Sequence, residues 1–142
     1  MSKIPGSVVD DCRIISIERH PHRQGTLTVA QNSGTLPFDL RRIYYIYDIP
    51  ADSERGGHAH IEQESLVIAV GGSFDVTVSD GVQTKKFTLN RPYEGLYIPA
   101  GIWRHIDNFS SGSIVLVLAS TDFSEDDYIR NFEDFVTAKA QK

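Results

Sequence analysis

The sequence contains little cysteine, no long apolar run and no surplus of positive charge. Its single cysteine, Cys12, has no partner for an intramolecular disulfide, which suits a reducing cytoplasm. No apolar stretch approaches the roughly 20 residues that cross a bilayer, and Met1 to Asp10 lacks the basic and apolar segments of an export signal. The net charge of −5 disfavours non-specific nucleic-acid binding. We therefore expect a cytoplasmic protein that binds neither nucleic acid nor membrane.

Helix signals are also scarce until the end of the chain. Short runs rich in Val, Ile, Tyr, Phe and Thr recur instead, separated by Gly, Pro, Asn or Asp, which is typical of an antiparallel β domain. The 142 residues, 40% of them hydrophobic, suffice for one domain over residues 1–142. A sandwich or small barrel of this kind can hold one small ligand in its mouth.

The predicted strands are Arg13–Glu18, Gly25–Gln31, Leu40–Asp48, His58–His60, Ser65–Val70, Ser73–Ser79, Thr84–Leu89, Leu96–Ile98, Trp103–Asn108 and Ser113–Ser120. The Asp80-Gly81 pair predicts a hairpin turn between two of them. Ser124 and the acidic residues after it predict a closing helix that begins there and ends near Phe135.

The segment His58-Ala59-His60 carries the clearest functional signal. Residues two apart on a strand point the same way, so we expect both imidazoles to enter one cavity. Glu64 and Gly71 follow at the spacing of the first cupin motif, and the segment from Pro99 to Arg104 resembles the second. The resemblance implies an all-β fold, a cupin-type jelly-roll barrel, with a short C-terminal helix.

Arg104 stands where metal-binding cupins have a histidine ligand. A guanidinium is always charged and has no lone pair for a metal, so the four-ligand site is broken and we expect no metal and no other cofactor. His105 is adjacent, but on a regular strand its side chain leaves on the opposite face from Arg104. One alternative stays open, in which His58, His60 and Glu64 form the two-histidine, one-carboxylate triad of a non-haem iron enzyme.

Several segments, in order along nearly the whole chain, resemble the dTDP-4-keto-6-deoxyglucose 3,4-ketoisomerases, a family of cupins. They are Arg23–Thr28, Pro37–Asp48, Arg55–His60, Leu116–Ser120 and Asp127–Phe132. The resemblance implies an isomerase that moves the keto group of a dTDP-linked 4-keto-6-deoxy sugar from C4 to C3 through an enediol, and that forms a homodimer. It also implies a role in making 3-amino-3,6-dideoxy sugars for bacterial surface glycans such as lipopolysaccharide. Ser65 departs from the glutamine of that family.

The resemblance and the shared strand face assign His60 as the base at C3 and His58 as its partner, because histidine takes and gives a proton near neutral pH. Something must also stabilise the enediolate. Tyr44, Arg42 and Arg104 are the candidates, and alternation places Arg42 and Tyr44 on one strand face.

Other side chains are candidates for holding the rest of the substrate. Arg41, Arg42 or Arg55 would pair with the diphosphate. Tyr97 or Trp103 would offer thymine an aromatic face, although barrel packing is favoured for both, and Glu64 is a further candidate for substrate binding. Two other functions stay open, a 3,5-epimerase of similar nucleotide sugars and a non-catalytic sugar-binding cupin.

Overall fold

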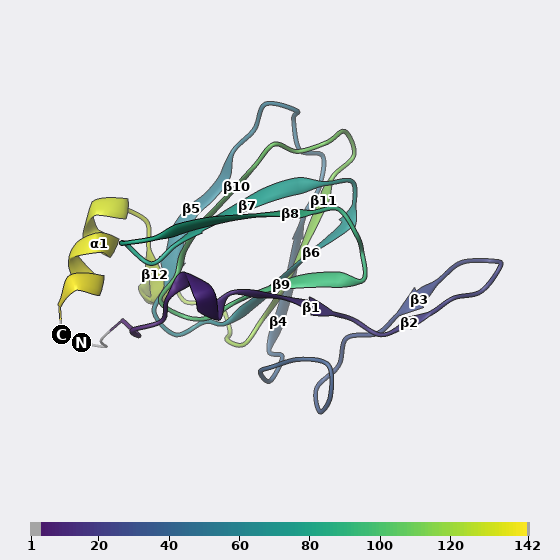
Figure 1. The fold of residues 1–142 in the computed structure, drawn as a ribbon, viewed down its shortest axis with the longest axis horizontal. Helices are drawn as coiled ribbons and strands as arrows, with labels where there is room; N and C mark the ends of the chain where they lie inside the picture. The colour runs from purple at the N-terminus through teal and green to yellow at the C-terminus, as the bar shows by residue number, and fades with distance from the viewer. Residues whose placement is uncertain (1–3, 142) are drawn as a thin grey trace.

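The computed structural model describes residues 4–141 (Figure 1). The predicted domain over residues 1–142 includes residues 1–3 and 142, which lie outside the described residues. Two 3₁₀-helices span Val9–Asp11 and Glu125–Asp127, and one α-helix, α1, spans Phe132–Ala140. None of the helices in this range is long and apolar enough to cross a membrane.

The remaining elements are short strands. They are β1 (Arg13–Ser16), β2 (Arg19–His20), β3 (Leu27–Thr28), β4 (Arg42–Ile46), β5 (Arg55–His60), β6 (Ser65–Gly71), β7 (Phe74–Ser79), β8 (Thr84–Leu89), β9 (Glu94–Ile98), β10 (Trp103–Asp107), β11 (Ile114–Ala119) and β12 (Tyr128–Ile129).

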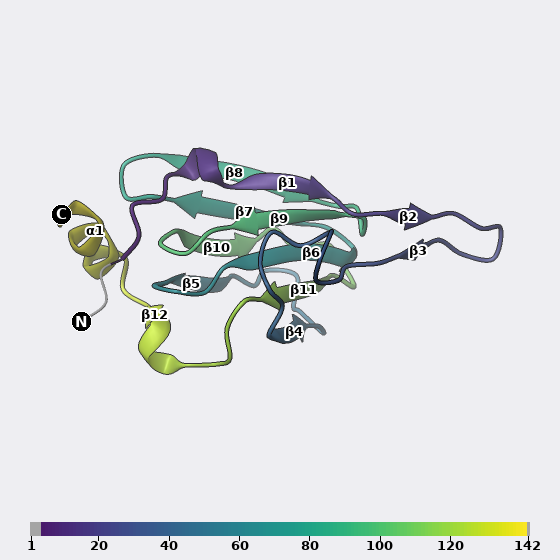
Figure 2. The same ribbon diagram turned by 90° about the horizontal axis from the view of Figure 1, so that it is seen from below.

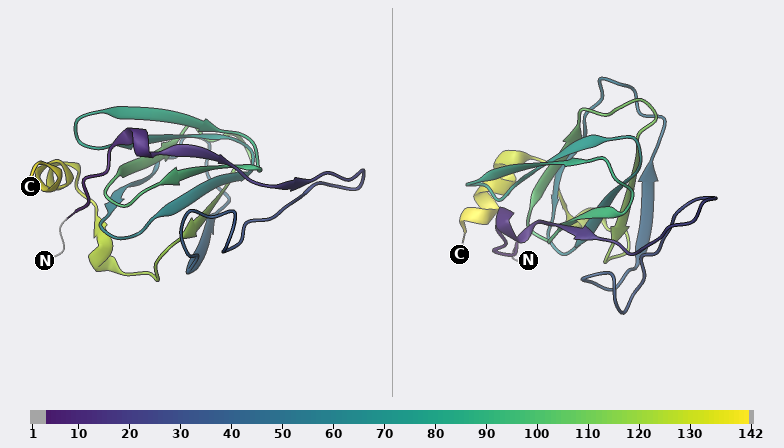
Figure 3. Two further views of the ribbon diagram at one scale, coloured as in Figure 1. Left: turned by 60° about the horizontal axis from the view of Figure 1, so that its bottom comes forward. Right: turned by 45° about the vertical axis from the view of Figure 1, so that its right-hand side comes forward.

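Two antiparallel sheets of five strands each form the body of the protein. The first sheet has the order β1-β9-β6-β11-β4, and the second has the order β12-β5-β10-β7-β8. The chain crosses between them repeatedly, for example from β6 in the first sheet to β7 in the second (Figures 1 and 2). Helix α1 lies at one end of the two sheets (Figure 3), where its Lys139 donates hydrogen bonds to the backbone carbonyls of Pro5 and Ser7. This arrangement confirms the predicted jelly roll with a short C-terminal helix.

Alternation along the strands fills the space between the sheets. On β6 and β11, Val67 and Val117 belong to the buried cluster between the two sheets. The alternate residues Leu66 and Leu118 face the other way and form a second cluster with Ile17 on the outer side of the first sheet. Both faces of this sheet are therefore apolar, and each must be buried against another structural element.

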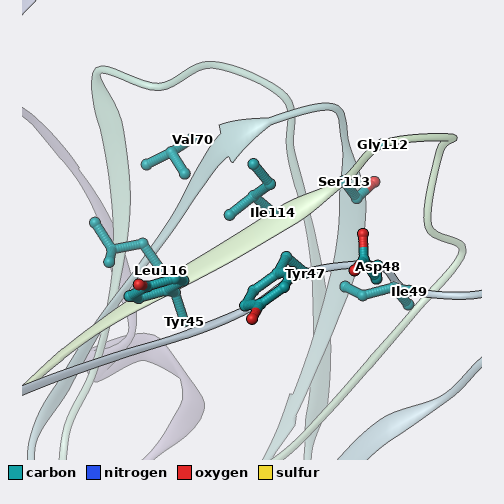
Figure 4. Close-up of a pocket in the computed structure, with 9 residues that line it drawn as sticks. All are labelled: Tyr45, Tyr47, Asp48, Ile49, Val70, Gly112, Ser113, Ile114 and Leu116. Atoms are coloured by element: carbon teal, nitrogen blue, oxygen red, sulfur yellow. The ribbon is translucent and has the colours of Figure 1, made fainter.

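Part of the outer side of the first sheet is left uncovered. Ile43, Tyr45 and Tyr47 of β4 and the segment after it are 54%, 61% and 58% exposed. The two tyrosines line a hollow of about 670 Å³ together with Val70 and Leu116 (Figure 4). We call these five residues the outer apolar face. The hairpin of β2 and β3 projects from the body near this sheet (Figure 2), and its Leu27 is 62% exposed.

Every predicted strand overlaps an observed strand, and β8 has the predicted bounds. The turn before β8 explains that agreement. Gly81 has a φ of 92°, and Asp80 Oδ1 accepts hydrogen bonds from the backbone N–H groups of Val82 and Gln83 at 2.9 and 2.7 Å. These local bonds determine the pairing register of β7 with β8.

The closing helix was predicted too early. After the 3₁₀-helix at Glu125–Asp127, the chain forms β12, in which Tyr128 pairs with His60 of β5. Helix α1 begins only at Phe132, where the side chain of Asn131 accepts a hydrogen bond from the backbone N–H of Asp134. Pairing with a distant strand, which the local sequence does not reveal, replaces the first turns of the predicted helix.

Candidate active site

The two histidines of the cupin motif lie at the end of β5 and contact each other. Their Nε2 atoms are 3.2 Å apart, and the rings meet nearly edge-on at an interplanar angle of 85°. His60 is completely buried, whereas His58 is partly exposed and lines a cavity of about 500 Å³. The alternation of β5 thus brings the two imidazoles together, and of the two only His58 lines the cavity.

Asp127 holds His60 from behind. Its Oδ2 atom lies 2.9 Å from His60 Nδ1, so the N–H group at this nitrogen donates a hydrogen bond to the carboxylate. The backbone N–H groups of Glu62 and Gln63 donate to Asp127 at 2.6 and 3.3 Å, which fixes the carboxylate in place. His60 Nε2 consequently carries the lone pair of a neutral ring, and the contact with His58 is a hydrogen bond when His58 Nε2 carries the proton.

The environment keeps both rings uncharged at neutral pH. Burial, followed by the neighbouring cation of Arg104, lowers the pKa of His58 from 6.5 to about 3. Burial and Arg104 also lower the pKa of His60 far below its ordinary value, with further contributions from His58, Arg42 and Arg130. A neutral imidazole keeps a ring nitrogen lone pair that can accept a proton, which is the form that a general base requires.

A bulge in β5 brings Arg55 and His58 to the same cavity. Residues three apart on a regular strand point to opposite faces, yet both of these residues line the cavity. The register between β5 and β10 shifts here, because Arg104 pairs with His58 whereas Ile106 pairs with Arg55. Gly56 supports this shift with a φ of 81°, a conformation that residues with a Cβ atom rarely adopt.

Arg104 is buried in the wall of this cavity, where it is only 4% exposed. Its guanidinium donates to the carbonyl of Ile102 at 3.3 Å and to Ser65 Oγ at 3.4 Å. No carboxylate lies within ion-pair distance of Arg104 in the described part of the chain. An uncompensated buried cation beside the histidines is costly to maintain, which is typical of a group that binds or stabilises an anion.

Tyr44 lines the same cavity from β4, in the opposite sheet. The guanidinium of Arg42 lies 4.9 Å from the centre of the Tyr44 ring, and Arg42 Nη2 donates to Gln63 Oε1 at 2.7 Å. The predicted pairing of these two side chains on one strand face is therefore present. Arg42 does not line the cavity itself, but it contacts Tyr44, which does, and its charge is among those that lower the pKa of His60.

Several predicted site residues lie elsewhere in this chain. Tyr97 donates to Glu64 at 2.6 Å and packs with the outer cluster of the first sheet. Trp103 packs against Phe132 and Phe135, below α1. Their direction follows from strand alternation, which turns neighbours of inward residues outward.

Arg41 does not line the cavity either. Its side chain is exposed, and its Nη2 atom pairs with Asp122 at 3.2 Å. His105 leaves β10 on the face opposite Arg104, as predicted, and its nearest carboxylate is Asp107 at 3.9 Å.

Three residues for which the sequence predicted no role lie at the site. Asp127 contacts His60, while Tyr128 and Arg130 line the cavity. The Tyr128 ring lies 4.4 Å from the His60 ring and 5.1 Å from the His58 ring, with the Arg130 guanidinium 4.2 Å from its centre. The only signal in the sequence was their presence in a segment resembling the ketoisomerases.

The geometry does not fit the iron-binding alternative. Glu64 is bonded to Tyr97 and does not join His58 and His60. Between residues 4 and 141, no three His, Cys, Asp or Glu side chains gather in a way that would hold a metal ion. The donor set that the alternative requires is therefore not assembled.

Comparisons with known proteins identify relatives that match most of this chain. Residues 10–140 match the family model FdtA, described as WxcM-like, C-terminal. The chain is 33% identical over 123 residues to a TDP-4-oxo-6-deoxy-alpha-D-glucose-3,4-oxoisomerase from Aneurinibacillus thermoaerophilus, covering 87% of this chain and 88% of the relative.

Solved structures of 3,4-ketoisomerases are also similar to this chain. A 3,4-ketoisomerase from Helicobacter canadensis is 39% identical with a TM-score of 0.89, over 92% of this chain and 98% of that one. A histidine-to-asparagine variant of a 3,4-ketoisomerase from Thermoanaerobacterium thermosaccharolyticum, in complex with TDP-4-keto-6-deoxyglucose, is 32% identical with a TM-score of 0.86, over 89% and 91% of the two chains. The match over nearly all of its length shows that the chain belongs to the FdtA family, described as WxcM-like, C-terminal.

Proposed function

We propose that this protein is a nucleotide-sugar 3,4-ketoisomerase that converts TDP-4-keto-6-deoxyglucose to its 3-keto isomer. One observation carries the proposal most directly. A neutral histidine, His58, faces a cavity large enough for a sugar, backed by His60 and Asp127 and flanked by the buried cation of Arg104. The activities printed for the relatives support the same reaction.

The reaction moves protons between two neighbouring carbons and their oxygens. His58 removes the proton from C3, and the electron pair of that bond forms the C3–C4 double bond of an enediolate with its charge on O4. O4 is then protonated, O3 loses its proton, and C4 takes up a proton as the C3 ketone forms. Every proton that leaves is replaced, so the product is an isomer and no oxidant is needed.

We revise the predicted roles of the histidines accordingly. The sequence assigned His60 to C3, but His60 is completely buried and does not line the cavity, whereas His58 does. His58 is therefore the group that touches the substrate. His60 shares a proton with His58 across 3.2 Å, and Asp127 sets the tautomer of His60, so the three residues form a relay for the protons that move.

Arg104 and Tyr44 stabilise the enediolate from two sides. Both line the cavity, Arg104 from β10 and Tyr44 from β4. Donors that are already in place where charge develops contribute about 10²- to 10³-fold in rate each. Acid–base catalysis alone supplies about 10²- to 10⁴-fold, so the reaction needs both effects.

The diphosphate of the substrate binds at Arg55 and Arg130. Both guanidiniums line the cavity, and Arg130 is held by Glu125 through bonds of 2.8 and 3.1 Å. Charge-assisted hydrogen bonds from guanidinium groups suit phosphate oxygens. Arg41, on the protein surface beside Asp122, is not part of this assignment.

The protein acts as a homodimer. The outer apolar face offers the exposed side chains of Tyr45 and Tyr47 for burial, and contiguous exposed apolar side chains of this kind are suited to an interface between proteins. The hairpin of β2 and β3 projects from its own chain (Figure 2), although an isolated two-stranded hairpin is barely stable in water. A second copy seated on this face would cover both features with two-fold symmetry. In the cell, we place the enzyme in the cytoplasm, in the synthesis of surface glycans such as lipopolysaccharide.

One experiment tests the reaction. The protein is incubated with TDP-4-keto-6-deoxyglucose in D₂O with a chelator, and the sugar is followed by NMR. We expect the keto signal to move from C4 to C3 without deuterium at C5. Exchange at C5 would indicate a 3,5-epimerase, and binding without any change in the sugar would indicate a sugar-binding protein. Either result would overturn the proposal, and H58N serves as the inactive control.

A second experiment tests the dimer. Light scattering after size exclusion is expected to give twice the chain mass of 15.9 kDa. Y45K places a charge on the outer apolar face and is expected to reduce that mass to one chain, whereas K85E, on the opposite sheet, is expected to leave it unchanged. A single-chain mass for the unaltered protein at micromolar concentration would contradict the dimer.

A further inference from the structure

A buried glutamine links the charged groups of the site. Gln63 lies in the connection between β5 and β6, is 1% exposed and does not line the cavity. Its Oε1 atom accepts from Arg42 Nη2 at 2.7 Å and from Thr121 Oγ1 at 3.3 Å, and its Nε2 atom donates to Ser65 Oγ at 3.0 Å. Both ends of the amide are thus satisfied, as buried polar groups require.

The chain of bonds continues to the second cation. Ser65 Oγ accepts from Arg104 Nη1 at 3.4 Å, so Gln63 and Ser65 together bridge the guanidiniums of Arg42 and Arg104. Neither guanidinium has a carboxylate partner among residues 4–141. The bridge therefore holds two like charges near the histidines without neutralising either of them.

The backbone of Gln63 reaches the histidines as well. Its N–H donates at 3.3 Å to Asp127 Oδ2, the same atom that contacts His60 Nδ1 at 2.9 Å. One residue is consequently bonded to the aspartate behind His60 and to Arg42, and is linked to Arg104 through a single hydroxyl.

We propose that Gln63 is a positioning residue for the isomerisation, which sets the two uncompensated guanidiniums at fixed distances from the histidine pair. The inference rests on the proposed function of this site. A neutral amide is required because it accepts from one cation and donates toward the other. A carboxylate at this position would oppose the cations that add to the effect of burial on the histidines, and an alkyl group would leave Arg42 without its acceptor.

Two substitutions separate these effects. Q63L removes both side-chain bonds, and we expect kcat to fall by about tenfold or more while KM for TDP-4-keto-6-deoxyglucose changes little, because misplaced groups weaken transition-state stabilisation. Q63E keeps an acceptor for Arg42 and adds a negative charge. The charged groups around the histidines are Arg104, Arg42, Arg130 and Asp127, together with Glu54 and Arg55, which line the cavity beside His58. The added charge opposes the cations among them. We expect the acid limb of the kcat/KM profile to move to higher pH.

The matched controls are Q83L and Q83E, in the exposed turn between β7 and β8, which should leave both the rate and the pH profile unchanged. If the unaltered protein moves no keto group, the proposed function fails first. If it is active and folded Q63E and Q63L both match it in kcat and pH profile, the inference about Gln63 is overturned. If circular dichroism shows that Q63L does not fold, the pH profile of Q63E alone tests the inference. If neither variant folds, S65A is used instead, because that substitution cuts the same bridge. We expect S65A to lower kcat, and an unchanged kcat would overturn the inference.

Discussion

Replacing Asp127 by asparagine tests whether the tautomer of His60 matters for the reaction. Asp127 Oδ1 accepts from the backbone N–H of Glu62 at 2.6 Å, while Oδ2 lies 2.9 Å from His60 Nδ1. In D127N, the short bond to Glu62 selects the amide oxygen at the Oδ1 position, which leaves the NH₂ group facing His60 Nδ1. That nitrogen must then accept a hydrogen bond, so the proton of His60 moves to Nε2, toward His58.

This shift blocks the proposed relay. Two Nε2 atoms 3.2 Å apart cannot both carry a proton, so His58 must also change its tautomer or turn away. The same carboxylate-to-amide change behind the catalytic histidine of a serine protease costs about 10⁴-fold in kcat through the wrong tautomer. Because the proposed role of His60 is to act through His58, without contact to the sugar, we expect a smaller loss in D127N, of about 10²- to 10³-fold in kcat.

Two measurements decide the outcome. The rate of keto migration at saturating TDP-4-keto-6-deoxyglucose gives kcat, and nitrogen-15 NMR of the histidine rings reports which nitrogen carries the proton. D126N is the matched control, since it makes the same change at an exposed neighbour in the same 3₁₀-helix. A folded D127N protein with the kcat of D126N, or with the His60 proton still on Nδ1, would refute the reasoning.

Buried groups elsewhere in the site and the core give three more tests. Removing the cation in R104M is expected to raise the pKa of His58, which moves the acid limb of the kcat/KM profile to higher pH. We also expect kcat to fall by about 10²-fold. An unchanged pH profile of kcat/KM would count against a role for Arg104. The pKa of His58 falls from 6.5 to about 3 on folding, and that of His60 also falls. Between pH 6.5 and these lowered values, the unfolded chain therefore binds more protons than the folded protein. The free energy of unfolding should therefore decrease as the pH drops below 6.5, by about 1.4 kcal/mol per pH unit for each histidine. Urea unfolding at pH 7 and pH 5 measures this dependence on pH, which should be about half as steep in H58N. Burial raises the pKa of the Cys12 thiol to about 11, so iodoacetamide at pH 8 should modify it only when the chain unfolds; labelling of the folded protein at the rate of the urea-unfolded chain would show that the thiol is accessible.

Much of the barrel could be predicted because its signals are local. Hydrophobic alternation marked the strands, and the Asp80-Gly81 turn placed β8 at its predicted bounds. The start of α1 could not be read in the same way. Ser124 and the acids after it satisfy the rules for a helix start, but Tyr128 gains a backbone partner in His60, 68 residues earlier (128 − 60), and forms a strand.

The sequence by itself determined which side chains could meet along one strand. His58 and His60 are two residues apart, as are Arg42 and Tyr44, and alternation is enough to bring each pair together. The loss of the cupin metal ligand at Arg104 was equally visible, because no arrangement of a guanidinium can coordinate a metal.

Only the tertiary structure decided which histidine faces the cavity and what stands behind the other. Asp127 reaches His60 across 67 residues of sequence, through the strand β12 that no local pattern indicated. Arg55 joins His58 because a bulge at Gly56 changes the parity of β5, and Glu64 turns away to Tyr97. These outcomes depend on long-range pairing, whose free energy comes from segments that are distant in the sequence, so short-range periodicity contains no record of them.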